Sequence, residues 1–214
     1  MFVFGGYLND KSPTLDEIPK ETDNETQYSD WVRNLCAENS WLVKIPNSYI
    51  LDSFNCNGIS DLFENFTIIH KIIRGLKPGK KDKQLDESIY TEAQSLYFLL
   101  HARYIVTYPG AKDMKDKFDS ALFGKCPRVR CKNTHLLPIG LSPILKQEPV
   151  KLFCVSCKDI FDSQEPYDGA CFGPYFPTFL QQVLYFESTF PDCEKKLLSY
   201  NGIPYEEAED NQCN

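Results

Sequence analysis

Two close pairs of cysteines dominate this sequence. The first pair lies in Cys126-Pro127-Arg128-Val129-Arg130-Cys131, and the second, Cys154-Val155-Ser156-Cys157, follows after 22 further residues. Each pair of thiols can hold two corners of a tetrahedron through a tight turn, and the residues between the pairs suffice for two strands that bring the corners together. We therefore predict a structural Zn²⁺ site, one per chain, with the ligands Cys126, Cys131, Cys154 and Cys157. The alternative is four ordinary buried thiols in a chain that carries 9 cysteines.

The overall composition indicates a globular protein of one or two domains, since 42% of the 214 residues are hydrophobic. The first six residues are mostly apolar but no basic region precedes them, and no run approaches the ~20 apolar residues of a membrane helix. We expect an intracellular protein of cytoplasm and nucleus, with no membrane partner. Because thiols stay reduced there, paired cysteines are more often metal ligands than disulfides. Five cysteines are then left as free thiols: Cys36, Cys56, Cys171, Cys193 and Cys213.

The net charge is −7 and the acids concentrate towards the two ends. Nucleic acid is therefore an unlikely partner, because phosphate binding draws on clustered Lys and Arg. Residues 1–24 combine Gly, Pro and acidic side chains without any periodicity, which predicts a flexible acidic arm. A second acidic run lies at 206–210.

A mostly α-helical domain is predicted over residues 25–122. Apolar side chains recur at three- and four-residue steps, and the third predicted helix is expected to bury Ile59, Leu62 and Phe66 among others. Gly75 should end this helix, and Pro109-Gly110 should end the next. The expected helices cover residues 29–36, a short stretch after 47, 60–74, 86–105 and 111–122, with an extended segment at 41–45.

A small β domain is predicted over residues 123–178, where four prolines exclude a long helix. Short extended pieces remain at 136–137, 150–153 and 159–161. The predicted fold class is thus α+β: a mostly α-helical N-terminal domain, a small β zinc-ribbon domain and an extended C-terminal tail over residues 179–214.

The residues around the thiols leave two questions open. Arg128, Arg130 and Lys132 either offset the charge of about minus two on a zinc with four thiolates or contact phosphate, as in a nucleic-acid-binding ribbon. The small β domain also contains many apolar side chains for its size. They either form a face for self-association or pack inward on the helical domain. These are Pro127, Val129, Leu141, Ile160, Phe172 and Phe176.

An enzyme is the weakest hypothesis, because no catalytic constellation is recognisable. His70, His101 and His135 are scattered, and the first two fall in predicted helices, where satisfied packing residues are more common than bases. Gly5-Gly6 is not followed by the Lys-Ser or Lys-Thr of a phosphate loop. Four thiolates also close the coordination sphere that a catalytic zinc would keep open.

Several strings together resemble the regulatory beta subunits of casein kinase II. The resemblance spans about residues 28–180 and is strongest in its second half. The strings are Leu100-His101-Ala102-Arg103-Tyr104-Ile105, Phe123-Gly124-Lys125-Cys126-Pro127-Arg128-Val129, Leu137-Pro138-Ile139-Gly140-Leu141-Ser142, Val150-Lys151-Leu152-Phe153-Cys154, Asp168-Gly169-Ala170 and Phe172-Gly173.

This resemblance implies a non-catalytic regulatory subunit of a tetrameric Ser/Thr protein kinase, which modulates kinase stability and the choice of protein substrates. It implies a homodimer through the zinc ribbon, with Pro127, Val129, Leu141 and Ile160 at the contact. The family's docking hairpin for the catalytic kinase subunit carries an aromatic pair, and its nearest counterpart here is Tyr200-Asn201-Gly202-Ile203. Ile203 replaces the second aromatic residue and one residue is inserted, so docking is expected through Tyr200 and Ile203, with Phe179 as a neighbour. A zinc-ribbon nucleic-acid-binding or transcription-associated module remains the alternative.

The chain departs from the family at two further places. Lys77, Lys80, Lys81 and Lys83 stand where relatives carry an acidic loop, so the polyamine role of that loop is not expected here. The usual N-terminal serines are absent, but Thr14 and Thr22 each have a glutamate three residues on, a pattern that this kinase prefers. We expect phosphorylation at these two threonines.

Overall fold

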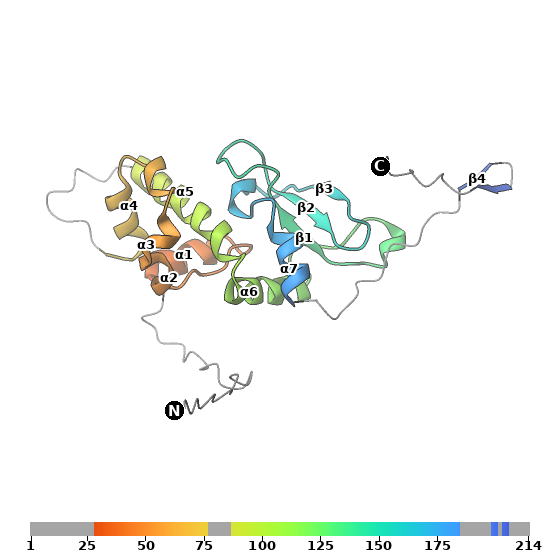
Figure 1. Cartoon of the computed structure of the whole chain (residues 1–214), viewed down its shortest axis with the longest axis horizontal. Helices are drawn as coiled ribbons and strands as arrows, with labels where there is room; N and C mark the ends of the chain where they lie inside the picture. The colour runs from red at the N-terminus through yellow and green to blue at the C-terminus, as the bar shows by residue number, and fades with distance from the viewer. Residues whose placement is uncertain (1–27, 77–86, 185–197, 201–202, 206–214) are drawn as a thin grey trace, which may run out of the picture.

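The computed structural model describes residues 28–76, 87–184, 198–200 and 203–205. Helices gather at one end and a small sheet lies at the other (Figure 1). The predicted acidic arm, the lysine-rich segment, the acidic tail, Thr14 and Thr22 lie outside the described residues. Among the helices of the described part, none is long and apolar enough to cross a membrane.

The first helices form as short pieces around a buried loop. α1 (Asp30–Glu38) is capped by Ser29, whose side chain accepts a hydrogen bond from the backbone N–H of Val32. The hydroxyl of Ser29 also donates to the carbonyl of Ile73, at the end of α4 (Phe66–Ile73). α2 (Asn47–Leu51) and α3 (Ser53–Cys56) follow residues 42–46, which form neither a helix nor a strand. The predictions of α1 and of a helix after residue 47 are therefore confirmed, whereas the segment predicted as extended at 41–45 forms no strand, and Trp41 lies in a turn.

The predicted continuous helix over 60–74 is wrong in its first half. A short 3-10 helix, η2 (Ser60–Leu62), is followed by Phe63 in extended conformation, and α4 (Phe66–Ile73) starts after it. Ile59 is buried whereas Leu62 is exposed, so the two cannot lie on one buried helix face. Gly75 ends α4 as predicted, with a positive φ of 71° and Ser29 so close that a Cβ would lie 2.9 Å from its side chain.

α5 (Glu87–Tyr104) and α6 (Tyr108–Asp119) are separated by three residues, and the boundary between them differs from the prediction. α5 ends at Tyr104, and Pro109 and Gly110 lie inside the first turn of α6 rather than ending α5. Thr107 caps α6 by accepting a hydrogen bond from the N–H of Gly110. Proline is tolerated there because the first helical turn has no intrahelical partner for its N–H groups.

The sheet has the order β1-β2-β3 and is antiparallel: β1 (Leu136–Ile139), β2 (Lys151–Cys154) and β3 (Ile160–Asp162). Pro138 fits because β1 is an edge strand, where a missing N–H costs little. Two short 3-10 helices flank it, η3 (Val129–Cys131) and η4 (Gly169–Cys171). The mixed architecture of helices and a small antiparallel sheet is as predicted.

α7 (Phe176–Leu184) packs on α6 and β1. The domain boundary expected after residue 178 falls inside this helix. Its place beside α6 is visible in Figure 1, where α7 crosses from the sheet to the helices. Further along the chain, β4 (Leu198–Tyr200) and β5 (Ile203–Tyr205) form a two-stranded antiparallel hairpin.

One apolar core runs through both halves. Trp41 of the helical half stacks on Tyr167 with ring centroids 5.2 Å apart and meets Phe123 and Phe172 edge-on. Phe172 and Phe176 are buried in this core, so they do not contribute to an exposed self-association face. The helices therefore serve as the base on which the cysteine-bearing sheet is fixed.

Candidate metal centre

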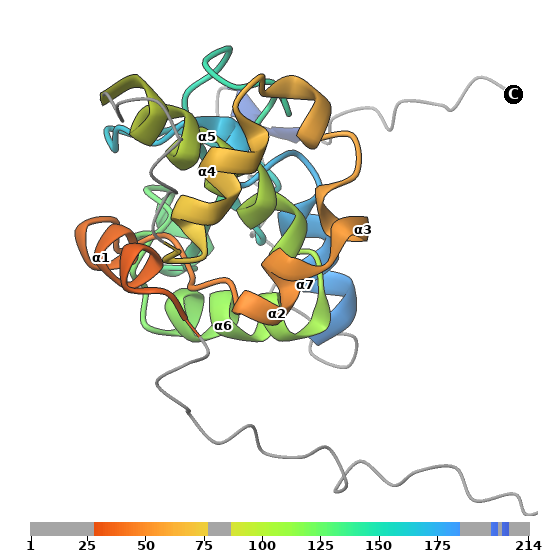
Figure 2. The same ribbon diagram turned by 90° about the vertical axis from the view of Figure 1, so that its left-hand side faces the viewer.

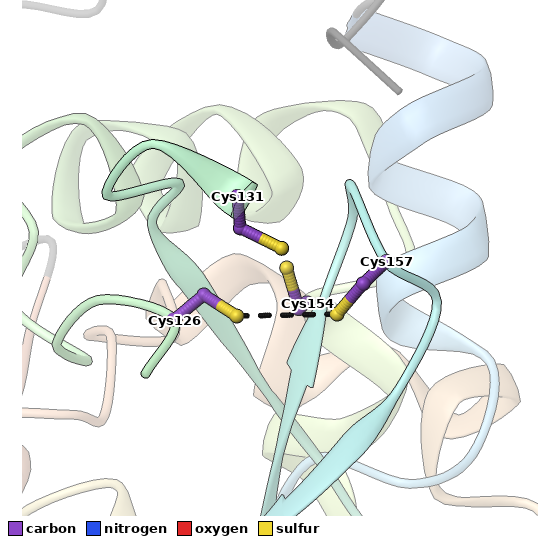
Figure 3. Close-up of side chains that lie close together, drawn as sticks. All are labelled: Cys126, Cys131, Cys154 and Cys157. Carbon is purple, nitrogen blue, oxygen red and sulfur yellow. Dashed lines mark hydrogen bonds between the residues drawn. The ribbon is translucent and has the colours of Figure 1, made fainter. Parts of the chain in front are cut away.

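The four predicted ligands come together at one end of the sheet. The sulfur atoms of Cys126, Cys131, Cys154 and Cys157 all lie within 4.8 Å of one another, and they point towards a common centre (Figure 3). The Sγ atoms of Cys126 and Cys157 are 3.9 Å apart. A tetrahedral zinc with bonds of about 2.3 Å places its sulfur ligands about 3.8 Å from one another. The spacing of the thiols thus fits one metal ion.

The first cysteine turn is held by its own backbone. The N–H of Cys126 donates to the carbonyl of Thr134 at 2.8 Å, and the hydroxyl of Thr134 donates to the carbonyl of Cys131 at 2.5 Å. Cys131 ends η3, after which Lys132 and Asn133 take left-handed conformations with φ of 50° and 63°. The chain reverses direction at these two residues before it enters β1. This reversal keeps Cys131 close to Cys126.

The second turn is shorter and begins at the end of β2. The N–H of Lys158 donates to the carbonyl of Cys154 at 2.9 Å, and the N–H of Cys154 donates to the carbonyl of Asp159 at 3.0 Å. Lys158 is left-handed, with φ of 58°. In both turns a lysine adopts this conformation directly after the second cysteine, a shared feature that cysteine spacing does not reveal.

The thiols differ in how readily they ionise. Burial raises the pKa of Cys126 and of Cys154 above the usual value for a thiol. Burial acts in the same sense on Cys157, but hydrogen bonds from the backbone of Asp159 and from neighbouring thiols lower its pKa overall. A divalent cation at the centre of the four sulfur atoms would favour the thiolate form of all four.

The basic residues around the first turn take part in its structure. Arg128 forms an ion pair with Asp159, which follows the second turn, so this pair connects the two turns. Arg130 is half-buried. The arrangement favours charge support for the thiolates over a phosphate contact at Arg128. Asp159 was not among the predicted site residues, although its place two residues after Cys157 could have indicated it.

The four apolar residues expected at a dimer contact all lie at the surface of the described structure. Val129 is 94% exposed, and Pro127, Leu141 and Ile160 are also exposed. Phe179 of α7 is half-buried against the shared core. Tyr200 and Ile203 pair with one another across the β4–β5 hairpin.

Two histidines and one thiol that an enzyme could have used as a base or a nucleophile have structural contacts instead: His101, His70 and Cys36. His101 is fully buried between two backbone groups, and His70 contacts the carbonyl of Ile50 at 2.9 Å. An open depression of about 580 Å³ between α1, the segment 42–44 and α6 is lined by Cys36 and Lys117, among others. Burial raises the pKa of Cys36, which disfavours the nucleophilic thiolate.

Comparison with known proteins places these features in one family. The family model described as "Casein kinase II regulatory subunit" matches residues 30–201, which include all four clustered cysteines. This chain belongs to the casein kinase II regulatory subunit family. The match covers Tyr200 but ends before Ile203, and it begins after Thr14 and Thr22.

Individual relatives of the casein kinase II regulatory subunit family agree with this assignment. The chain is 35% identical over 165 residues to casein kinase II subunit beta-2 of Neurospora crassa, which covers 77% of this chain and 58% of the relative. It is 36% identical to casein kinase II subunit beta of Dictyostelium discoideum, covering 79% of this chain and 65% of the relative. For the subunit beta of Schizosaccharomyces pombe the identity is 32%, with 83% and 78% covered. The chain thus spans about three fifths of the length of the first two relatives.

Proposed function

We propose that this chain is a non-catalytic regulatory subunit of a casein kinase II type Ser/Thr protein kinase. One Zn²⁺, held by Cys126, Cys131, Cys154 and Cys157, stabilises a zinc ribbon through which two chains dimerise. The dimer carries two catalytic kinase subunits and modulates their stability and substrate choice. The observation that carries the proposal is the family match over residues 30–201 together with four thiols at the spacing of a tetrahedral zinc site.

In this proposal, different residues of the chain bind the metal, the second copy and the kinase. The four thiolates bind zinc, which supplies a structural cross-link with no open coordination position. The exposed apolar residues around the first turn and on β3 meet the second copy. The β4–β5 hairpin, with Phe179 as a neighbour, binds the catalytic subunit.

Replacing Val129 with aspartate is expected to convert the dimer into monomers. A carboxylate that is desolvated in an apolar contact without a partner costs about 3 kcal/mol or more, which weakens dimerisation roughly a hundredfold or more. Sedimentation velocity measures the effect, and zinc content should stay unchanged because the side chain of Val129 points to solvent. The matched control is Tyr108→Asp, an equivalent change at an exposed site on α6. A Val129→Asp protein that sediments as a dimer would remove this residue from the contact.

Replacing Tyr200 with alanine is expected to weaken binding of the catalytic kinase subunit about thirtyfold while leaving the dimer intact. Aromatic anchors at interface centres typically contribute about 2 kcal/mol or more. Titration calorimetry with the isolated catalytic subunit measures the affinity. The matched control is Tyr90→Ala, a tyrosine that is exposed on α5, outside the proposed docking site. Unchanged affinity for Tyr200→Ala would move the docking site elsewhere on the chain.

A further inference from the structure

Three large apolar side chains are exposed on one short stretch of the helical half. Phe54 of α3 is 78% exposed, Leu62 of η2 is 66% exposed, and Leu51 at the end of α2 is 51% exposed. We call these three residues the Phe54 patch. In Figure 2, α3 lies at the outer edge of the helical half. Three large exposed apolar side chains within twelve consecutive residues are a composition typical of interaction surfaces.

The backbone beneath the Phe54 patch is firmly anchored. The guanidinium of Arg103 on α5 donates to the carbonyls of Asn55 and Asn57, each at 2.8 Å. Buried Ile50 and Ile59 hold the chain on both sides of α3. These anchors fix the backbone that carries Phe54, which is the arrangement found at binding anchors, because little ordering is needed when a partner arrives.

The charged side chains within the stretch that carries the patch are all acidic. Residues 51–65 contain Asp52, Asp61 and Glu64, all exposed, and no Lys, Arg or His. Arg103, which reaches this stretch from α5, donates to its backbone carbonyls. The surface therefore combines apolar anchors with a surround that attracts cations.

We propose that the Phe54 patch is a docking surface for an amphipathic protein segment that carries Lys or Arg beside apolar side chains. The apolar anchors supply affinity, and the three carboxylates supply orientation and a faster association rate. A second copy of this chain is a poor occupant, because a symmetric contact would bring the same carboxylates face to face. The surface is separate from the metal centre and from the hairpin, so the proposal does not depend on the proposed function.

The test uses the full-length, zinc-loaded protein and a fluorescein-labelled helical peptide of Leu and Lys, followed by fluorescence anisotropy. A peptide with Glu in place of Lys should bind at least about tenfold more weakly. The double variant Phe54→Ser, Leu62→Ser should also weaken binding of the Leu–Lys peptide at least about tenfold. The control Leu122→Ser, Ile144→Ser, which changes two exposed apolar residues outside the Phe54 patch and outside the proposed dimer contact, should bind it as the unchanged protein does. Equal affinity of the Phe54 and control variants would overturn the proposal.

Two further variants test the role of the carboxylates and the identity of the segment that binds. Asp61→Asn with Glu64→Gln should reduce the affinity and flatten its dependence on salt, because fewer charges are screened. Changing Lys77, Lys80, Lys81 and Lys83 to serine tests whether the chain's own basic segment occupies the patch. An unchanged affinity supports an external partner, whereas an affinity increased about tenfold or more would assign the patch to that segment and overturn the proposal.

Discussion

Replacing Cys157 with serine is expected to release zinc from the full-length protein and to unfold both cysteine turns, while α4 and α5 keep their structure. A structural zinc contributes about 10 kcal/mol or more to the folding of the segment that binds it. The apolar cluster around the site cannot replace that contribution, because three of its four buried residues are themselves cysteines: Cys126, Cys131 and Cys154. Only Leu136 adds a buried aliphatic side chain.

The result is measured by zinc content per chain and by hydrogen exchange. Amides of the two turns, such as that of Cys126 bonded to Thr134, should lose protection, while α5 stays protected by the shared core. The dimer should be lost together with the metal. Cys36→Ser is the matched control, because a hydroxyl can keep the contacts of that thiol with Tyr97 and Val43. A Cys157→Ser protein that lacks zinc and still sediments as a dimer would break the proposed link between metal and dimerisation.

The four-thiol site and most helices could be predicted because their signals are local. The paired spacing of the cysteines limits where four sulfur atoms can meet, and Ser29 and Gly75 mark helix ends through properties of single residues. The predicted role of His101 as a satisfied packing residue is confirmed, since both ring nitrogens have backbone partners.

The sequence could not predict which apolar side chains are buried and which are exposed, because this depends on the elements that cover each side chain. Leu62 fits the periodicity of a core helix, but the extended residue Phe63 turns the chain and leaves it exposed. Phe172 and Val129 are equally apolar in the sequence. Phe172, at the end of η4, is buried against Trp41, whereas Val129, at the start of η3, faces solvent.

Acidification from pH 6.5 to pH 4 is expected to destabilise the fold by up to about 3 kcal/mol through His101. This histidine is fully buried, and its Nε2 accepts a hydrogen bond from the N–H of Val43 at 3.1 Å, which requires that Nε2 carry no proton. Nδ1 then donates to the carbonyl of Cys171 at 2.7 Å. Burial lowers the pKa of His101 from 6.5 to about 4, against the opposing effect of that carbonyl.

The loss of stability on acidification follows from comparing the protonation of His101 in the folded and the unfolded chain. Above pH 6.5 His101 is neutral in both the folded and the unfolded chain, so its contribution to stability is complete. As the pH falls towards 4 the unfolded chain takes up the proton first, and the free energy of unfolding decreases until the folded histidine is protonated as well.

Urea denaturation at a series of pH values measures this slope, and His101→Gln supplies the reference. Glutamine carries an acceptor and a donor but does not titrate, so the difference in slope between the two proteins isolates the histidine from proton uptake by the cysteine cluster. Identical slopes would contradict the prediction. Because His101 connects the segment 41–45 to η4, hydrogen exchange at Val43 should increase before that of α4 as the histidine becomes protonated.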